Sequence, residues 1–284
     1  MTRIGPYQLH TIETGTFALD GGAMFGVVPR PLWEKRIPPD DRNRIPLAMR
    51  CLLVESSDRL ILIDNGVGHK YSEKFAELYA VDHTASALAL SLAAAGFGID
   101  EVTDVVLTHL HFDHAGGSTA RNGERLEVVF ANAQHHVQRS QWATAVAPNP
   151  RESPSFLDEN LNPLGESGLL VMHDGEKSIF PGITVKPYFG HTDAMQVVQI
   201  ADATRTLAFV ADLLPTSHHF GAAWTMAYDI RPLESISEKE GFLARAAKHG
   251  WSVFFEHDPV VIIADVEQTE RGFRARNARP LAEL

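Results

Sequence analysis

Four side chains that commonly bind metal ions lie within six consecutive residues of this chain, namely His109, His111, Asp113 and His114. They follow an apolar, β-branched run, Val102–Thr108, which predicts a strand. In an extended backbone, residues two apart point to the same side, so His109, His111 and Asp113 share a side. His114 reaches the same point once the chain turns after Asp113, and the two glycines that follow permit that turn. The segment therefore predicts a metal site at the end of a strand.

Four ligands so close in sequence cannot all serve one tetrahedral zinc ion without strain, so we expect two metal ions, each completed from elsewhere. Three later ligand-type residues each follow a predicted strand: His191, Asp212 and His257. Functional residues are often found on loops that a rigid scaffold positions. Imidazole and carboxylate ligands without thiolate suit zinc, and also Mn, Co or Fe. An aspartate can bridge two ions, and two ions about 3.5–4 Å apart can hold a hydroxide between them.

The rest of the chain predicts an α/β fold. Apolar runs predict strands at Met49–Glu55, Arg59–Asp64, Leu126–Phe130, Ile183–Tyr188, Val197–Ile200, Thr206–Val210 and Ser252–Phe255. Helical spacing predicts helices at Ser72–Ala80, Thr84–Ala95, Ala133–Ala145 and Leu233–His249. Residues 29–46 and 147–168 are rich in proline and predict long loops, which either cover a substrate or are plain surface excursions. Strands in runs, with helices between the runs, favour two mixed sheets packed face to face with helices outside.

Composition narrows the class of partner. The net charge of −11 repels phosphate backbones, so we expect no nucleic acid partner and a neutral small-molecule substrate. The longest uncharged stretch, Thr84–Ile99, is too short and too weakly apolar to span a bilayer, so we expect no membrane partner. The only cysteine, Cys51, lies in an apolar run and predicts a buried side chain. The N-terminus lacks the apolar run of a signal peptide, and a soluble cytoplasmic protein is the expectation.

These motifs resemble the metallo-β-lactamase superfamily over nearly the whole chain. The resemblance implies one domain spanning residues 1–284 and an αββα sandwich with the metal ions at one edge. It implies that one zinc ion is bound by His109, His111 and His191 and the other by Asp113, His114 and His257. It further implies that Asp212 bridges the two ions and that Asp64, which follows an early strand, supports the site from behind its ligands.

Two segments are similar to the branch of quorum-quenching N-acyl homoserine lactonases, which neighbours the methyl parathion hydrolases. They are Leu19–Pro29, within an N-terminal extension at about residues 17–46, and Asp212–His219. The resemblance implies that Met24 and Phe25 line a pocket for an acyl chain, although ordinary core packing explains both equally well. The sequence departs from the branch where some lactonases have a tyrosine three residues after the bridging aspartate, because Pro215 stands there.

The expected donor to the substrate carbonyl is therefore His219, with His218 as the alternative. In the expected reaction, a bridging hydroxide attacks the carbonyl carbon of a lactone or ester. Asp113 takes the proton of the nucleophile and passes it to the leaving alkoxide. N-acyl homoserine lactones are the first expectation for the substrate and phosphotriesters or arylesters the second, and a non-catalytic metal-binding or sensor protein is the alternative class. A homodimer is also expected, with Trp33 in the N-terminal segment covering a neighbour.

Overall fold

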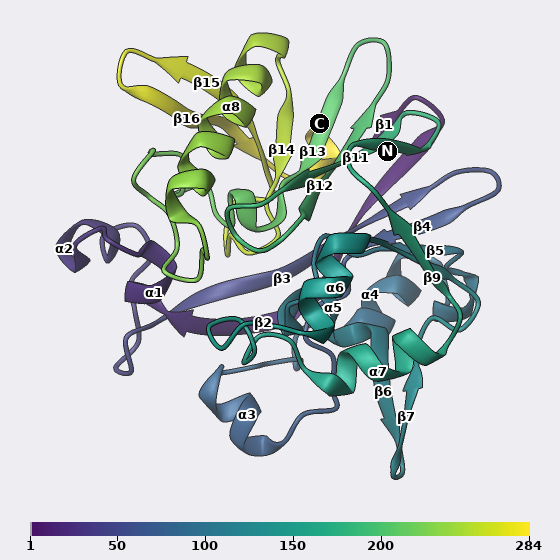
Figure 1. Ribbon diagram of the computed structural model, residues 1–284. Helices are drawn as coiled ribbons and strands as arrows, with labels where there is room; N and C mark the ends of the chain where they lie inside the picture. The colour runs from purple at the N-terminus through teal and green to yellow at the C-terminus, as the bar shows by residue number, and fades with distance from the viewer. Residues whose placement is uncertain (1) are drawn as a thin grey trace.

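Two seven-stranded sheets pack face to face in the computed structural model, which describes residues 2–284 (Figure 1). The strand order is β1-β2-β3-β4-β5-β8-β9 in the first sheet and β10-β11-β12-β13-β14-β15-β16 in the second. In the first sheet, β4, β5, β8 and β9 are parallel and the other pairs are antiparallel. In the second sheet only β13 and β14 are parallel. The predicted sandwich of two mixed sheets is confirmed.

The strands of the first sheet are β1 (Arg3–Ile4), β2 (Tyr7–Asp20), β3 (Arg44–Glu55), β4 (Leu60–Ile63), β5 (Asp104–Val106), β8 (Gln134–Gln138) and β9 (Leu170–His173). Those of the second are β10 (Lys177–Phe180), β11 (Ile183–Tyr188), β12 (Met195–Ala201), β13 (Thr206–Phe209), β14 (Ser252–Phe254), β15 (Ile263–Thr269) and β16 (Gly272–Arg279). A separate hairpin is formed by β6 (Thr119–Asn122) and β7 (Arg125–Val128). The strand predicted at Leu126–Phe130 therefore belongs to this hairpin and not to either large sheet.

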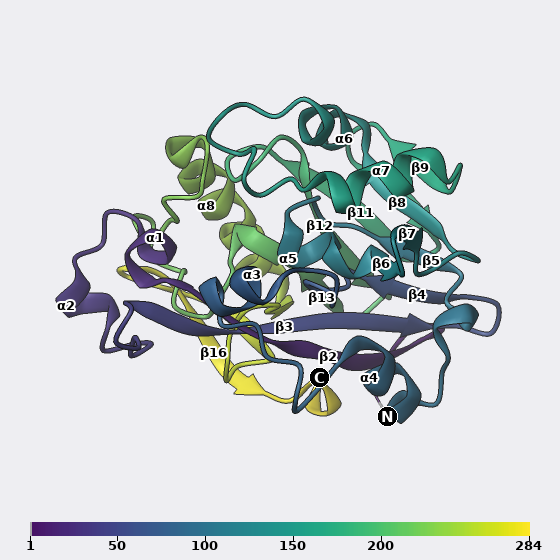
Figure 2. The same cartoon turned by 90° about the horizontal axis from the view of Figure 1, so that it is seen from below.

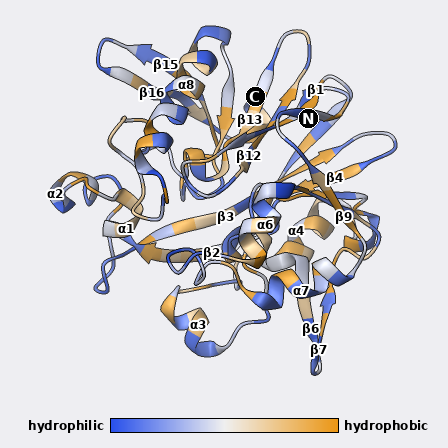
Figure 3. Ribbon diagram, in the orientation of Figure 1, coloured by the Kyte–Doolittle hydropathy of each residue, from blue (hydrophilic) through white to orange (hydrophobic). Residues whose placement is uncertain are grey.

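The first sheet is apolar on both faces, since alternate residues of its central strands enter different cores. Leu52 and Val54 of β3 belong to the core between the two sheets. Cys51 and Leu53 of the same strand belong to the core between the first sheet and its helices. A side-chain period of two produces this division. It explains why the strands read as continuous apolar runs and appear mostly orange in Figure 3.

Helices lie on both outer faces of the sandwich, at one of its ends and at the edge between the sheets (Figure 1 and Figure 2). They are α1 (Gly21–Phe25), α2 (Arg30–Trp33), α3 (Glu73–Leu78), α4 (Leu88–Ala95), α5 (Phe112–Ala115), α6 (Arg139–Val146), α7 (Asp158–Glu166) and α8 (Pro232–His249). Side chains of α4, α6 and α7 complete the outer core of the first sheet, and α8 packs on the second. Single 3-10 turns lie at η1 (Ile99–Glu101), η2 (Gly116–Ser118), η3 (Ala211–Leu213) and η4 (Leu281–Glu283). Among residues 2–284, no helix has the length and apolar character needed to cross a membrane.

Two predictions between residues 133 and 168 are corrected. Residues 134–138 form β8 and not the first half of a helix, because they pair on both sides with β5 and β9. Tertiary pairing here overrides local helical preference. Residues 158–166 form α7 and not a loop, although Pro163 lies inside the helix. Leu161 and Leu164, one turn apart, bury the same face of α7 in the outer core of the first sheet.

The segment predicted as a loop at residues 17–46 is strand at both ends. Phe17–Asp20 of β2 pair with Arg44–Leu47 of β3. The excursion between these strands carries α1 and α2, which project from one end of the sandwich (Figure 2). Trp33, expected to cover a neighbouring chain, is 1% exposed and stacks on Phe25 of its own chain. A third core lies beneath the excursion, and Met24, Phe25 and Trp33 belong to it.

Candidate metal centre

The first four ligand-type residues lie directly after β5, where the chain leaves the first sheet. His109 and His111 lie in the turn before α5, and α5 begins at Phe112. Asp113 and His114 therefore stand on a short helix that begins before Asp113, whereas the sequence analysis placed the turn after it. Each of the four side chains is buried. The short helix replaces the extended geometry expected for Asp113, yet it turns both side chains toward the same point.

The remaining three residues follow strands of the second sheet. His191 comes after β11, Asp212 lies in η3 after β13, and His257 comes after β14. The residue before Asp212, Ala211, has φ of 43°, a left-handed backbone that is costly for a residue with a side chain. Such a conformation is kept only where the surrounding structure enforces it, and here it directs Asp212 toward the first sheet. The seven residues thus meet at one edge of the sandwich, between the two sheets.

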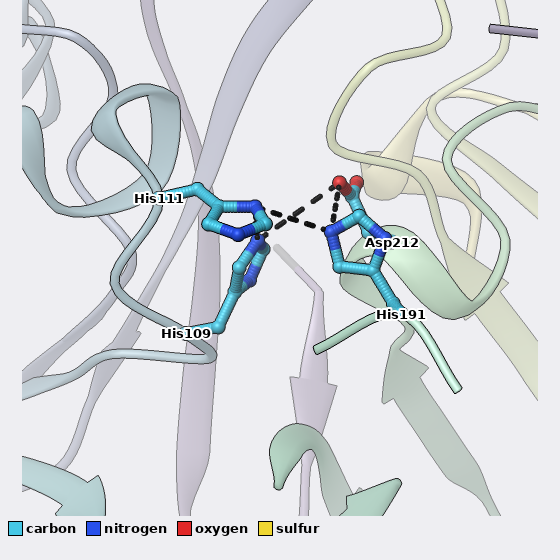
Figure 4. A group of neighbouring side chains, drawn as sticks. All are labelled: His109, His111, His191 and Asp212. Carbon is cyan, nitrogen blue, oxygen red and sulfur yellow. Dashed lines mark hydrogen bonds and ion pairs between the residues drawn. The ribbon is translucent and has the colours of Figure 1, made fainter. Parts of the chain in front are cut away.

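Three imidazole nitrogens converge with one carboxylate in the first donor group, which consists of His109, His111, His191 and Asp212 (Figure 4). Nδ1 of His111 lies 3.1 Å from Nε2 of His109 and 3.2 Å from Nε2 of His191. Oδ2 of Asp212 lies 3.2 Å from Nε2 of His191 and 3.9 Å from Nε2 of His109. Nitrogen ligands about 2.0–2.1 Å from a tetrahedral zinc ion stand roughly 3.3 Å apart, which is close to these separations.

The second donor group consists of Asp113, His114 and His257. Nε2 of His114 lies 3.1 Å from Nε2 of His257, and Oδ2 of Asp113 lies 3.7 Å from each of these two nitrogens. Asp212 stands between the groups, since its Oδ1 lies 3.3 Å from His257 and its Oδ2 lies 3.2 Å from His191. Oδ2 also lies 3.6 Å from Nε2 of His114. The carboxylate therefore contacts both groups, as a bridging ligand must.

The donor set fits divalent metal ions. Oδ1 of Asp212 is buried without any hydrogen-bond donor in the described part of the chain. Burying a carboxylate oxygen without a partner is costly unless a cation compensates it. Imidazole and carboxylate donors without thiolate suit zinc and its neighbours among the transition metals. The donor atoms converge, and Oδ1 of Asp212 has no hydrogen-bond donor among the described residues. Both observations favour bound metal ions over a network in which the side chains bond only to one another.

The ring nitrogens that face away from the cluster are held by fixed acceptors. Nδ1 of His191 lies 2.9 Å from Oδ1 of Asp229, and Nδ1 of His257 lies 2.9 Å from the carbonyl oxygen of Ala48. An acceptor on the outer nitrogen keeps the proton there and leaves the inner nitrogen free for a metal ion. The outer nitrogen of His111, Nε2, is an exception, since it is buried and has no hydrogen-bond partner among residues 2–284.

His114 is held by two carboxyl groups. Its Nδ1 lies 3.1 Å from Oδ2 of Asp64 and 3.0 Å from Oε2 of Glu256. Asp64 also accepts hydrogen bonds from the amide and the hydroxyl of Thr108, at 2.7 and 2.6 Å. Its φ of 55° is a further left-handed conformation at the site. Asp64 is therefore fixed on both sides, between Thr108 and His114.

Charge inside the cluster shifts several pKa values. Burial lowers the pKa of both His109 and His111. Burial also opposes protonation of His191, but Asp212 and Asp229 outweigh it and raise the pKa of His191 to about 10. Burial raises the pKa of Glu256 to about 8, despite the opposing effect of His114. The cluster without metal therefore holds protons, which a bound metal ion displaces.

A cavity of about 400 Å³ opens above the two donor groups. Its floor is formed by His111, Asp113, His191, Asp212 and His257. Its walls are Leu19, Met24, Tyr79, Phe112, Arg151, Glu152, Pro154, Ser155, Met226, Ala227 and Tyr228. The walls are mainly apolar and aromatic on the side of the N-terminal excursion, and polar where the loop before α7 meets the cavity. A mostly apolar cleft with a few polar groups is the usual form of a small-molecule site.

A family model described as the metallo-beta-lactamase superfamily matches residues 46–232, which is more than half of the chain. The chain belongs to the metallo-β-lactamase superfamily. Members of this superfamily bind divalent metal ions, and the two donor groups are the candidate metal positions in this chain.

Curated relatives in the superfamily are distant. A probable metallo-hydrolase of Mycobacterium tuberculosis is 25% identical over 217 residues, which cover 67% of this chain and 66% of the relative. An N-acyl homoserine lactonase of a Bacillus species is 24% identical over 165 residues, which cover 55% of this chain and 59% of the relative. The chain thus spans less than two thirds of the length of these relatives.

Solved structures of the superfamily share the fold over nearly the whole chain. A probable metal-dependent hydrolase of Staphylococcus aureus matches with a TM-score of 0.88 and 31% identity, over 98% of this chain and all of the other. AidC, described as a dizinc quorum-quenching lactonase in complex with its product, matches with a TM-score of 0.80 over 98% of this chain and 97% of its own. At 20% identity, AidC shows the fold alone.

Two of the residues expected to contact substrate do not reach the cavity. His219 is 1% exposed, and its ring nitrogens contact the hydroxyl of Thr216 at 2.8 Å and the carbonyl of Met24 at 2.9 Å. Phe25 stacks on the His219 ring, with centroids 4.9 Å apart, and lies behind the wall. Both nitrogens of His219 are engaged, so the structure corrects the substrate-donor prediction. His218 is half-buried outside the cavity, whereas Met24 lines it.

The sequence analysis missed several residues that surround the two donor groups. Asp229 and Glu256 hold the outer nitrogens of ligands, and Arg151, Glu152 and Tyr228 line the cavity. Glu256 precedes a ligand and follows a strand, so its position could have marked it. Asp229 and the cavity residues lie in irregular segments, where no period or motif distinguishes a functional side chain from a surface one.

Proposed function

We propose that the protein is a dinuclear zinc hydrolase that opens lactone rings, with N-acyl homoserine lactones as its substrates. The observation that carries the proposal is Asp212, whose carboxylate contacts both donor groups beneath a cavity with an apolar wall. The Bacillus relative and AidC are both described as lactonases, which supports this choice among ester substrates.

In this proposal, His109, His111 and His191 hold one ion, Asp113, His114 and His257 hold the other, and Asp212 bridges them. A pair of bound cations lowers the pKa of water into the neutral range and polarises a carbonyl oxygen. The supporting residues keep each imidazole in the tautomer that presents its inner nitrogen. Replacement of zinc by Mn, Co or Fe leaves this assignment of ligands unchanged.

Asp113 moves the proton. It lines the cavity as well as the second donor group, so its carboxylate faces both the floor and an incoming substrate. It takes a proton from the attacking water and gives it to the alkoxide oxygen as the ring opens. Tyr228 keeps its hydroxyl proton, since burial raises its pKa above the ordinary value for a tyrosine. Its hydroxyl is therefore available as a hydrogen-bond donor in the same cavity.

The walls orient a substrate with a polar head and an apolar tail. Leu19, Met24 and Met226 form an apolar surface for an acyl chain. Arg151, Glu152 and Ser155 form the polar side, close to His191. A neutral, amphipathic ester satisfies both sides, whereas a polyanionic substrate would meet Glu152 and Asp113.

The test is ring opening by purified, zinc-loaded protein, followed by proton release and by chromatography of the product. N-acyl homoserine lactones with acyl chains of about 4 to 12 carbons should be hydrolysed, and Asp113→Asn should abolish most of the rate. No ring opening with any chain length, in protein that holds two ions, would reject the proposal. It would then favour a metal-binding or sensor role.

A second candidate is hydrolysis of arylesters or phosphotriesters. The aromatic side chains Tyr79, Phe112 and Tyr228 along the cavity favour it, because they offer a surface for an aryl group. Phenyl acetate and paraoxon assayed beside the lactones distinguish the two. A kcat/KM higher for either of these than for every lactone would reverse the order of the candidates.

A further inference from the structure

The loop between α6 and α7 lines the cavity and also contacts residues that position members of the first donor group. Arg151, Glu152, Pro154 and Ser155 lie on its polar wall. The same short segment contacts residues next to His111 and His191, both members of the first donor group. We refer to residues 149–156 as the clasp loop.

Arg151 binds the segment Ala227–Asp229, whose last residue supports His191. Its Nη2 donates to the carbonyl oxygen of Ala227 and, at 3.3 Å, to that of Asp229. The carboxylate of Asp229 lies 2.9 Å from Nδ1 of His191, and the amide of Ile230 donates to the carbonyl of His191 at 3.2 Å. The guanidinium therefore ties the clasp loop to the support of a ligand.

Glu152 contacts Thr192, the residue that follows His191 in the chain. Its Oε1 accepts a hydrogen bond from the hydroxyl of Thr192 at 2.6 Å, and its Oε2 accepts one from Asn149. Glu152 is 3% exposed, and no basic side chain among residues 2–284 forms an ion pair with it. A buried carboxylate without a cation is costly, which argues for a role beyond stability. Positive charge in the neighbouring donor group would offset that cost.

The far end of the clasp loop reaches His111. The amide of Phe112 donates to the carbonyl oxygen of Ser155 at 3.0 Å. The ring of Phe156 lies against that of His111, with centroids 4.8 Å apart. One loop of eight residues thus contacts His111 directly, and it contacts Thr192 and Asp229, which adjoin or support His191.

From these contacts we propose that the clasp loop and the first metal position form one cooperative unit. Arg151 and Glu152 are positioning residues for His191, and binding of metal at His109, His111 and His191 orders the loop that walls the cavity. The coupling is reciprocal: if metal binding stabilises the ordered loop, then displacement of the loop lowers the affinity for metal by the same factor. The inference rests on the metal-binding part of the proposed function and not on the identity of the substrate.

The first test measures metal affinity with Co²⁺, added to metal-free protein in competition with a chelator. Arg151→Lys keeps the charge but loses the fork that reaches two carbonyls, and Glu152→Gln keeps the shape. Each variant should bind one equivalent of cobalt about 10- to 100-fold more weakly than the wild type, with the other equivalent unchanged. The visible absorption of cobalt identifies which position is lost.

The matched control is Arg121→Lys, because Arg121 pairs with Glu159 on the surface, and both side chains are about 40% exposed. It should bind both equivalents as the wild type does. A purely structural defect would lower the melting temperature of the metal-free variants, whereas the proposal expects that temperature to be unchanged. Wild-type affinity for both equivalents in both clasp-loop variants would overturn the positioning roles.

The second test needs no variant. Amide hydrogen exchange of the wild-type protein is followed by mass spectrometry with and without Co²⁺. Exchange in residues 149–156 should slow by at least about tenfold on metal binding, and exchange in the β15–β16 hairpin should not change. Equal exchange of the clasp loop in both states would overturn the coupling. Failure of the wild type to bind Co²⁺ would instead reject the proposed metal centre, and this inference with it.

Discussion

Oδ1 of Asp229 lies 2.9 Å from Nδ1 of His191, although the two residues are 38 positions apart in the chain. The contact fixes which ring nitrogen of His191 faces the first donor group, since the carboxylate holds the proton on the outer nitrogen. Asp229 is itself fixed, because its Oδ2 accepts from the amide of Met226 and its carbonyl accepts from Arg151. The geometry of a metal ligand thus depends on an irregular segment that contributes no ligand.

Replacement of Asp229 by asparagine should weaken metal binding at this position. An amide can present a donor to Nδ1 and so favour the wrong tautomer of His191. We expect a loss of about 10- to 100-fold in affinity for one zinc ion, measured by chelator competition. Asp174→Asn, at an exposed ion pair with Arg139, is the matched control. Equal zinc affinity in the two variants would contradict the role of Asp229.

Replacement of Asp113 by asparagine should lower kcat for lactone opening by about 100- to 10,000-fold. The amide cannot accept the proton of the attacking water. Metal content must be measured in the same preparation, because Asp113 also belongs to the second donor group. A variant that holds two ions and keeps wild-type kcat would show that the proton moves by another route.

Protonation of His191 should make the metal-free protein depend on pH. Burial lowers the pKa of His191, but Asp212 and Asp229 raise it to about 10, above the usual value of 6.5. A raised pKa contributes stability that is fully present below pH 6.5 and is lost as the pH rises toward 10. The difference in free energy of unfolding between the wild type and His191→Asn should therefore shrink over that interval.

Urea unfolding of both metal-free proteins at pH 6.5 and pH 9.5 measures this difference. Addition of zinc should remove the dependence on His191 protonation, because a metal-bound imidazole carries no proton on the inner nitrogen. A difference that is constant, or that grows with pH, would contradict the protonated state assigned to the metal-free cluster.

Met24 should control the length of acyl chain that the cavity accepts. Truncation to alanine enlarges the apolar wall, and each additional buried methylene is worth about 0.8 kcal/mol, or roughly fourfold in kcat/KM. Met24→Ala should therefore raise the ratio of kcat/KM for dodecanoyl over hexanoyl homoserine lactone by about fourfold or more.

Phe25 provides the control for Met24. Its ring packs between Trp33 and His219 behind the wall, so Phe25→Leu should lower the free energy of unfolding by about 1–3 kcal/mol without changing chain-length preference. An equal shift in preference in both variants would mean that the N-terminal excursion, and not Met24 itself, sets the preference.

The sequence by itself determined the sandwich and pointed to the seven residues that the structure brings together. Continuous apolar runs such as Ile61–Ile63 are typical of strands buried on both faces, and His109, His111, Asp113 and His114 follow such a strand. These are local patterns, and backbone geometry converts them directly into structure. His191, Asp212 and His257 were recognisable for the same reason, because each follows a strand.

Only the tertiary structure decided what surrounds those ligands. His114 and His257 are in contact although they lie 143 positions apart in the chain. The carbonyl oxygen of Ala48 contacts the ring of His257 although these residues lie 209 positions apart. The sequence marks no such partner, because a contact between distant segments depends on how two sheets pack. The same reason explains the errors: β5 and β9 draw residues 134–138 into a sheet, and Thr216 and Met24 occupy both nitrogens of His219.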